Sequence, residues 1–284
     1  MLKLGISGLG FVGNSMLESF LEKKVNVIGY DKYKNIGVDL FKDLLNVEII
    51  FLALPTKFDE NTQTYDISEI IDSCEFLNSE KYNGLVVIKS TVIPGTTEKL
   101  SNKFQNLNLI HNPEFLSAKT AFEDFHNQKH IVLGITEKCN FEKYLLLKNF
   151  YSSNYKCLIS ECKSTESETM KCFANSFYAV KIQFFTEMYL TCKSNGSNFD
   201  EVKNMMLKNG WINPMHTNVP GSDGKISYGG YCFPKDTKAL NNYMKENKIL
   251  NSVLNSTIKE RDSIRNDSTN ILNKINESYK NKEI

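Results

Sequence analysis

Gly8-Leu9-Gly10-Phe11-Val12-Gly13 follows the apolar run Leu2–Ile6 and opens a segment with helical spacing, Phe11–Lys23. A G-x-G-x-x-G turn between a strand and a helix is typical of a dinucleotide-binding βαβ unit. Gly8 permits the tight turn, Gly10 lets the backbone approach a pyrophosphate, and Gly13 lets the helix pack closely on the strand. The backbone N–H groups of Phe11 and Val12, at the start of the helix, can bind the phosphates. The turn therefore predicts a phosphate-binding site at the edge of an α/β sheet.

Asp31 ends the second predicted strand, Val25–Tyr30. A carboxylate at this place can accept hydrogen bonds from the ribose hydroxyls of an adenosine, and it repels the 2′-phosphate of NADP. Lys32 and Lys34 lie close by in the sequence and soften that preference. The pattern predicts NAD as the cofactor.

Apolar runs alternate with helically spaced segments through the first half of the chain. The runs are nearly continuous, which is typical of parallel strands buried on both faces. Such alternation predicts an α/β fold with a Rossmann-type, doubly wound parallel sheet, which we assign to residues 1–160. The expected strands are Leu2–Ile6, Val25–Tyr30, Val47–Leu54, Leu85–Lys89, Leu107–His111 and Ile131–Ile135, and the expected helices are Phe11–Lys23, Gly37–Leu45, Ile67–Ser79 and Thr96–Phe104.

Residues 161–284 predict an all-helical domain. Ser164–Asn195 reads as one long helix, on which Met170, Phe173, Phe177, Phe184 and Met188 form an apolar stripe. The stripe is more than a small helical domain can cover, so it predicts a homodimer. An irregular stretch, Gly210–Gly230, precedes a helix at Thr237–Glu246, and we expect the last dozen residues to be disordered.

Composition excludes several classes of partner. The formal net charge of +1 gives no field that would recruit nucleic acid or an anionic membrane. No run approaches 18 uncharged apolar residues, and the N-terminus does not have the pattern of a signal peptide. The seven cysteines are scattered, which predicts reduced thiols in a cytoplasmic protein and no structural metal site.

A second motif lies at Gly229–Asp236, Gly-Gly-Tyr-Cys-Phe-Pro-Lys-Asp. The two glycines allow a close approach of the backbone, and Lys235 follows Cys232 by three residues. A cation near a thiol favours the reactive thiolate. By themselves these residues fit a catalytic thiol and a structural cysteine in a tight turn equally well.

Together these motifs resemble the UDP-glucose 6-dehydrogenases of the UDP-glucose/GDP-mannose dehydrogenase family, over almost the whole chain. The segments that resemble the family's motifs, in order, are Gly8–Gly13, Pro55-Thr56, Lys89-Ser90-Thr91, Asn112-Pro113-Glu114-Phe115-Leu116, Lys171-Cys172-Phe173-Ala174-Asn175 and Gly229–Asp236.

The resemblance implies an oxidation of the sugar C6 alcohol to a uronate with two molecules of NAD, through a thiohemiacetal and a thioester on Cys232. Lys171 and Asn175 would stabilise the oxyanion, Glu114 would act as general acid and base, and Asp236 and Thr91 would position water. The implied catalytic residues are Cys232, Lys171, Asn175, Glu114, Asp236 and Thr91; cofactor contacts come from Thr56, Thr91 and Lys235 besides Gly8–Gly13 and Asp31; substrate contacts come from Glu114, Phe115, Leu116, Lys171, Asn175 and Gly229.

The chain departs from the family pattern in two respects. Ala118 stands where many relatives have a second glutamate. The resemblance also implies a short form without the C-terminal UDP-binding domain. Val219–Lys225 is either a loop that wraps the diphosphate in its place or an ordinary surface loop.

Three alternatives remain open. The substrate is another sugar nucleotide, such as UDP-N-acetylmannosamine or GDP-mannose; or the chain is a β-hydroxyacid-type dehydrogenase, which needs no cysteine; or it is an inactive module that binds NAD or a sugar nucleotide. The intact Cys232 motif argues against the second alternative. The joint retention of Cys232, Lys171, Asn175, Lys235 and Asp236 argues against the third.

Overall fold

The computed structural model describes residues 2–34, 37–38 and 40–265. It forms two compact units, which we call the sheet unit (residues 1–57 and 65–171) and the helical unit (residues 58–64 and 172–284). From the sequence we expected the change of domain after residue 160, whereas the compact units change at residue 171, inside a helix. The expected disorder of the last dozen residues lies outside the described residues.

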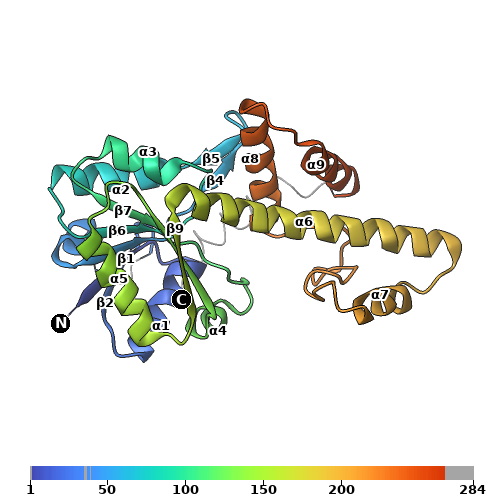
Figure 1. The fold of residues 1–284 in the computed structure, drawn as a ribbon, viewed down its shortest axis with the longest axis horizontal. Coiled ribbons are helices and arrows are strands. Elements are labelled where there is room, and N and C mark those ends of the chain that lie inside the picture. The colour runs from blue at the N-terminus through green and yellow to red at the C-terminus, as the bar shows by residue number, and fades with distance from the viewer. Residues whose placement is uncertain (1, 35–36, 39, 266–284) are drawn as a thin grey trace. The chain divides into compact units, whose positions relative to one another are not determined.

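A seven-stranded sheet forms the centre of the sheet unit (Figure 1). The α/β fold and all six predicted strands are confirmed, each with at least one end shifted by one or two residues. The glycine turn follows β1, which lies between β2 and β3. In the spatial order β2-β1-β3-β6-β7-β8-β9, the strands are β2 (Asn26–Tyr30), β1 (Lys3–Ser7), β3 (Ile49–Leu52), β6 (Leu85–Ile88), β7 (Asn108–His111), β8 (His130–Ile135) and β9 (Leu158–Lys163).

The expectation of a wholly parallel sheet is wrong at one pair, because β8 runs antiparallel to β7. The helix between them, α4 (Ala121–His126), has six residues. Residues 112–129 connect the two strands, and the chain enters β8 in the direction opposite to that of β7. The last strand, β9, which we did not predict, is again parallel to β8.

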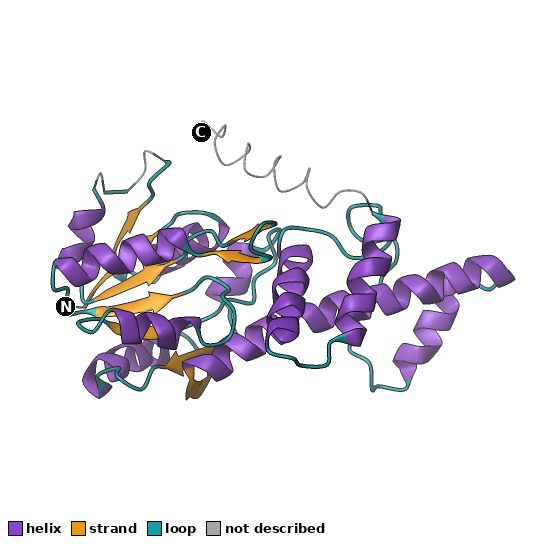
Figure 2. Ribbon diagram, turned by 90° about the horizontal axis from the view of Figure 1, so that it is seen from above, coloured by secondary structure: helices purple, strands orange, loops and turns teal. Residues whose placement is uncertain are grey.

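Helices cover both faces of the sheet (Figure 2). Along β3, Ile49 and Phe51 face the core that contains α1 (Phe11–Glu22), α4 and α5 (Phe141–Asn154). Ile50 and Leu52 face the other core, with α2 (Ser68–Ser79) and α3 (Thr96–Lys103). This alternation explains why the strands read as continuous apolar runs.

The predicted helix at Gly37–Leu45 is wrong. Gly37 has a φ of +84° and bridges to Tyr30, so the chain is extended there. Only a short 3₁₀ helix, η1 (Phe41–Asn46), follows. A small hairpin of β4 (Lys57–Asp59) and β5 (Thr64–Asp66), also not predicted, forms a separate two-stranded sheet.

Helix α6 (Ser164–Asn195) has the predicted bounds and 32 residues. Three residues of the predicted apolar stripe are exposed, Phe173 at 47%, Phe177 at 62% and Phe184 at 58% of their full accessible surface, whereas Met188 packs against the buried cluster around Phe185. The buried side of the helix is largely polar and includes Ser164, Ser167, Glu168, Lys171, Asn175, Ser176, Gln183 and Thr186.

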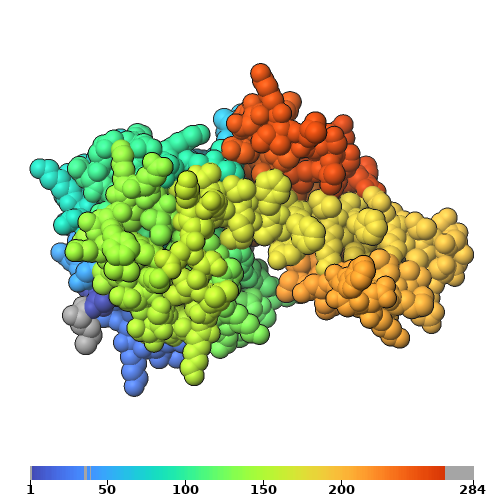
Figure 3. All heavy atoms as spheres, in the orientation of Figure 1, coloured from blue at the N-terminus to red at the C-terminus, as the bar shows by residue number. Residues whose placement is uncertain are grey.

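The helical unit contains the rest of α6 and three further helices among the described residues, α7 (Phe199–Lys208), α8 (Cys232–Glu246) and α9 (Ser252–Ile264). In Figure 3 the orange residues of α7 lie against the second half of α6, where Phe199 packs with Phe185. The predicted start of α8 at Thr237 is wrong by five residues. Pro234 does not prevent the earlier start, since the first N–H groups of a helix have no partner within it.

Candidate active site

The glycine turn of the sheet unit has the geometry that a dinucleotide needs. Gly8 has a φ of +90°, and a Cβ on Gly8 would lie 2.6 Å from the carbonyl oxygen of Ala53. A Cβ on Gly13 would lie 1.8 Å from the carbonyl oxygen of Gly8, so the first turn of α1 packs directly on the loop. Gly10 precedes α1 as its N-cap and brings no side chain into the space before the helix. These features fit a pyrophosphate at the N-terminus of α1.

Asp31 lies beside this turn, in a pocket that Gly8 also lines. Its carboxylate accepts backbone hydrogen bonds from Leu9 (2.7 Å), Tyr33 (2.9 Å) and Lys34 (3.1 Å). A carboxylate offers about four acceptor positions, so these bonds fix its orientation and leave capacity for a ribose hydroxyl. The predicted phosphate turn and the predicted ribose acid therefore lie at one pocket.

The loops after β3 and β6 are joined at the same edge of the sheet. Thr56 donates its hydroxyl to the carbonyl oxygen of Thr91 at 2.9 Å, and Ser90 donates to the carbonyl oxygen of Leu54 at 2.6 Å. The fold thus brings together Thr56 and Thr91, which are 35 residues apart in the sequence.

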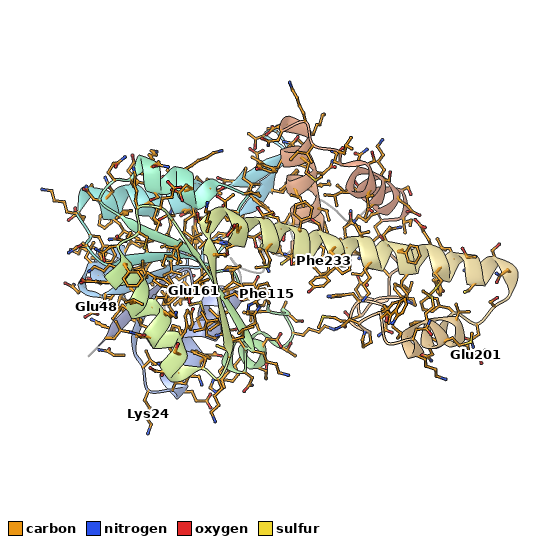
Figure 4. All side chains as sticks on the ribbon, in the orientation of Figure 1. Lys24, Glu48, Phe115, Glu161, Glu201 and Phe233 are labelled. Atoms are coloured by element: carbon orange, nitrogen blue, oxygen red, sulfur yellow. The ribbon has the colours of Figure 1, made fainter. Side chains whose placement is uncertain are left out.

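Lys171, which is buried, and Glu114, which is partly buried, form an ion pair. The Lys171 Nζ lies 3.3 Å from the Glu114 Oε1 and donates to the Glu114 carbonyl oxygen at 2.5 Å. The backbone N–H of Leu116 donates to the other carboxylate oxygen at 2.6 Å. Phe115, labelled in Figure 4, is exposed and stacks on the ring of His130. The centroid of its ring lies 5.2 Å from the Lys171 Nζ. The pair holds an ammonium group and a carboxylate in contact. The ammonium group can stabilise an alkoxide, and the carboxylate can accept and donate a proton.

Lys89 lies next to this pair and was given no role from the sequence. Its Nζ donates to the Asn112 Oδ1 at 3.0 Å, and the Tyr151 hydroxyl donates to the same oxygen at 2.7 Å. Burial lowers the pKa of Lys89 to about 7; Glu114 opposes this shift and Lys171 reinforces it. The signal in the sequence was a lysine directly after a fully apolar strand.

Polar side chains on the first turns of α6 form hydrogen bonds with other residues of the sheet unit. Glu168 accepts backbone hydrogen bonds from Gly95 (2.5 Å) and Thr97 (2.7 Å) at the start of α3, and burial raises its pKa to about 7. His111 shares a hydrogen bond of 2.8 Å with the Ser167 hydroxyl, and burial lowers the pKa of His111 to about 3, so the ring is neutral. Sequence reasoning missed these contacts, which fix the turn of α6 that presents Lys171.

In the helical unit, Cys232 is exposed and is the first residue of α8. The partial positive charge of a helix N-terminus favours a thiolate there. Behind it, the Asp236 carboxylate accepts from the Lys235 Nζ at 2.6 Å and from the Asn175 side-chain amide at 2.6 Å. Burial alone would lower the pKa of Lys235, but attraction to Asp236 and to Cys232 raises it overall, so this buried lysine stays charged.

Two buried arginines of the C-terminal segment hold the loop before Cys232. Arg265 donates to the Ser227 carbonyl oxygen at 3.0 Å and to Asp223 at 2.5 Å, while Arg261 donates to the Tyr228 carbonyl oxygen at 3.3 Å. A Cβ on Gly229 would lie 2.6 Å from the Arg265 guanidinium group. The predicted close approach at Gly229 is therefore made by Arg265, and the predicted substrate contact of Gly229 stays a prediction.

An aromatic cluster flanks Cys232. The ring of Phe233, labelled in Figure 4, lies 6.2 Å from Tyr178 and 5.4 Å from His216, centroid to centroid. Within the described part of the chain, no group of three or more His, Cys, Asp or Glu residues could hold a metal ion. No helix in that part is long and apolar enough to cross a membrane.

Comparison with known proteins identifies the family. Residues 34–153 match the NAD binding domain of the UDP-glucose/GDP-mannose dehydrogenase family, and residues 165–262 match its central domain. UDP-glucose 6-dehydrogenase of Rickettsia prowazekii is 33% identical over 238 residues, 80% of this chain and 51% of the relative. The Campylobacter jejuni enzyme of that name is 30% identical over 74% of this chain and 52% of the relative.

The chain thus spans about half the length of these two relatives. A solved structure, a UDP-glucose dehydrogenase from Pyrobaculum islandicum, shares the fold with a TM-score of 0.82 at 22% identity, covering 93% of this chain and 68% of that chain. Both domain models of one family match in order along the sequence, and they include the Lys171–Glu114 pair and the Cys232 loop. The chain belongs to the UDP-glucose/GDP-mannose dehydrogenase family and carries its NAD-binding domain.

Proposed function

We propose that the chain catalyses the NAD-dependent oxidation of the C6 alcohol of a nucleotide sugar to a uronate, with UDP-glucose as substrate and UDP-glucuronate as product. The observation that carries this proposal is the exposed Cys232 at the start of α8, next to the buried group formed by Lys235, Asp236 and Asn175. A structural cysteine has no need of exposure at a helix N-terminus, whereas a nucleophile does.

In the proposed reaction, two NAD molecules, bound one after the other at the glycine turn and Asp31, would supply the hydride acceptors for the two oxidations at C6. The C6 hydroxyl gives its proton to solvent water in the first oxidation, and the Lys171 ammonium group stabilises the developing alkoxide. The Cys232 thiolate then attacks the aldehyde carbon to form a thiohemiacetal. The second oxidation leaves a thioester on Cys232, so the reactive aldehyde is not released.

Water completes the reaction by attacking the thioester carbonyl, which releases the uronate and the Cys232 thiolate. Glu114 takes the proton from water in this step, and the amide of Asn175 donates to the tetrahedral oxyanion. We assign positioning of the water to Asp236 and Thr91, cofactor contacts to Thr56 and Lys235, and substrate contacts to Phe115, Leu116 and Gly229.

The buried charges support an enzyme over an inactive binding module. Lys171 and Lys235 are 3% and 4% exposed, and each contacts a carboxylate. Burying such pairs costs about as much free energy as their attraction returns, so they seldom serve stability alone. A module without catalysis would not need two of them.

We also propose a cytoplasmic homodimer formed through the exposed stripe of α6. Phe173, Phe177 and Phe184 are 47%, 62% and 58% exposed, and they lie on one side of the helix. A second copy of the chain is the proposed partner of this side.

Three sugar nucleotides are candidates for the substrate. The relatives from Rickettsia and Campylobacter are named UDP-glucose 6-dehydrogenases, which supports UDP-glucose. Structures of a UDP-D-ManNAc dehydrogenase from Pyrococcus horikoshii and a GDP-mannose dehydrogenase from Pseudomonas aeruginosa have the same fold, at 20% and 21% identity. Activity over these three substrates distinguishes them.

The decisive experiment is Cys232→Ser. With UDP-glucose and NAD, the wild-type protein is expected to form two NADH per uronate, and the variant to lose steady-state uronate formation by several orders of magnitude. A serine hydroxyl has too high a pKa to replace the thiolate. Mass spectrometry of wild-type protein quenched during turnover should detect a sugar-nucleotide adduct on the peptide that contains Cys232.

Direct titration with NAD provides the control, because the substitution leaves the glycine turn intact and NAD binding should persist. A folded variant with near wild-type uronate formation would remove Cys232 from the mechanism.

A further inference from the structure

The pocket at the glycine turn contains an ion pair that the proposed reaction does not use. Besides Gly8 and Asp31, the pocket is lined by Lys32, Tyr33 and two acids of α2, Glu69 and Asp72. All of these residues belong to the sheet unit. The carboxyl end of β2, where Asp31 lies, is the place at which an adenosine ribose binds in a sheet of this kind.

Glu69 binds the two residues that follow Asp31. The Lys32 Nζ lies 3.2 Å and 3.4 Å from the two Glu69 carboxylate oxygens, and the Tyr33 hydroxyl donates to Oε1 at 2.9 Å. The Tyr33 ring lies 5.6 Å from the same Nζ. The hydrogen bond to Glu69 raises the pKa of Lys32, so Lys32 is a cation whose charge Glu69 already engages.

The surroundings of Asp31 weaken the repulsion between its carboxylate and a 2′-phosphate. Its carboxylate already accepts three backbone N–H groups, which offset part of its charge, and a lysine is the next residue in the chain. An ammonium group at that position is a good ligand for a phosphate. Lys32 is the cation among the described residues that line this pocket, so its partner decides what the pocket attracts.

Glu69 also acts on the helix that carries it. It is the second residue of α2, and an acid in the first turn of a helix offsets the positive end of the helix dipole. Glu69 therefore cancels both positive features of this wall, the Lys32 ammonium group and the N-terminus of α2.

We propose that Glu69 is a cofactor-specificity residue, which selects NAD against NADP by holding Lys32 away from a 2′-phosphate. This inference rests on the proposed use of NAD. It differs from the role of Asp31, because Asp31 binds the ribose hydroxyls whereas Glu69 withholds the cation that would bind a phosphate in their place.

The test is Glu69→Ala, with the dissociation constants of NAD and NADP measured by titration calorimetry on the full chain. Freeing one ammonium group for a phosphate contact is expected to tighten NADP binding about tenfold or more, with NAD affinity changed less than about threefold. In the double variant Glu69→Ala with Lys32→Met, the gain for NADP should disappear. Glu69 and Lys32 are both partly exposed, so neither substitution threatens the core.

Asp72→Asn is the matched control, since it removes one negative charge from the same pocket and leaves Lys32 on Glu69. A gain for NADP as large as that of Glu69→Ala would show that net charge alone sets the preference and would overturn the inference. So would an unchanged NADP affinity in Glu69→Ala while NAD still binds. If the wild-type chain binds neither dinucleotide, the proposed function itself fails and this inference fails with it.

Discussion

Lys89 places a cation at the buried end of β6, where water cannot solvate it. The folded state therefore releases the proton at about pH 7, whereas the unfolded chain holds it to about pH 10.5. Between these values the unfolded state binds more protons, so the free energy of unfolding rises with pH. Below pH 7 both states are protonated and the cost of burial is fully present.

We therefore expect the stability difference between wild-type protein and Lys89→Met to move in favour of the wild type as pH rises from 7 to 9. The slope should approach about 1.4 kcal/mol per pH unit. Urea unfolding at several pH values measures it. Lys99→Met, at an exposed position of α3, is the control for the loss of a lysine that is not buried. A flat difference for Lys89→Met would mean that the lysine stays charged in the folded state.

Residue types identified part of the candidate site and missed the rest for a physical reason. Cys232, Asp31 and Glu114 lie in motifs that a reader of the sequence can find, because chemistry fixes their residue type. Lys89 and Glu168 contribute through burial, and burial depends on which elements pack around them. A lone lysine or glutamate in a sequence does not reveal that.

At the scale of elements, the packing of Arg265 on Gly229 in the loop before Cys232 can be tested by substitution. A Cβ on Gly229 would displace the Arg265 guanidinium group, which would give up its hydrogen bonds to Ser227 and Asp223. We expect Gly229→Ala to lower the free energy of unfolding by about 1–3 kcal/mol in a denaturant titration. Combining it with Arg265→Met should add little further loss, because the clash is then already relieved.

Gly224→Ala in the same loop separates backbone strain from this clash. Gly224 has a φ of +74°, and an added Cβ meets nothing within 4 Å, so the substitution costs only the left-handed conformation, about 1 kcal/mol. If Gly229→Ala proved milder than Gly224→Ala, the packing of Arg265 on Gly229 would not matter for stability.

Helical and strand periodicity predicted most elements of the fold, but not which face of a helix is buried or in which direction a strand runs. The bounds of α6 follow from its sequence, since no glycine or proline interrupts 32 residues. Its inward face does not follow, because the buried polar groups are paired with backbone N–H groups of α3 and with acids from distant loops. The direction of β8 does not follow either, because parallel and antiparallel strands have the same periodicity of two.

At the scale of the whole molecule, the exposed phenylalanines of α6 determine whether the proposed dimer forms. Replacing Phe177 and Phe184 by glutamate should convert the proposed dimer into a monomer, because each phenyl group contributes about 1.5–3 kcal/mol when buried and each carboxylate adds repulsion across the interface. Light scattering at micromolar concentration measures the mass of the particle.

Phe141→Glu is the control for that experiment, since Phe141 is also exposed, at 68%, but lies on α5 of the sheet unit. It should leave the mass unchanged. A wild-type chain that is monomeric at these concentrations would exclude the proposed dimer.

Arg261 and Arg265, which hold the loop before Cys232, are synthesised after that loop. Its contacts therefore form late in the synthesis of the chain. Tyr228 is synthesised 33 residues before its partner Arg261, and Asp223 is synthesised 42 residues before Arg265. At about 5–20 residues per second, roughly 2 to 7 seconds pass before a ribosome has added Arg261. During that interval the Cys232 thiol is present without the two contacts that fix its loop. The nucleophile is therefore the last part of the proposed site to be put in place during synthesis.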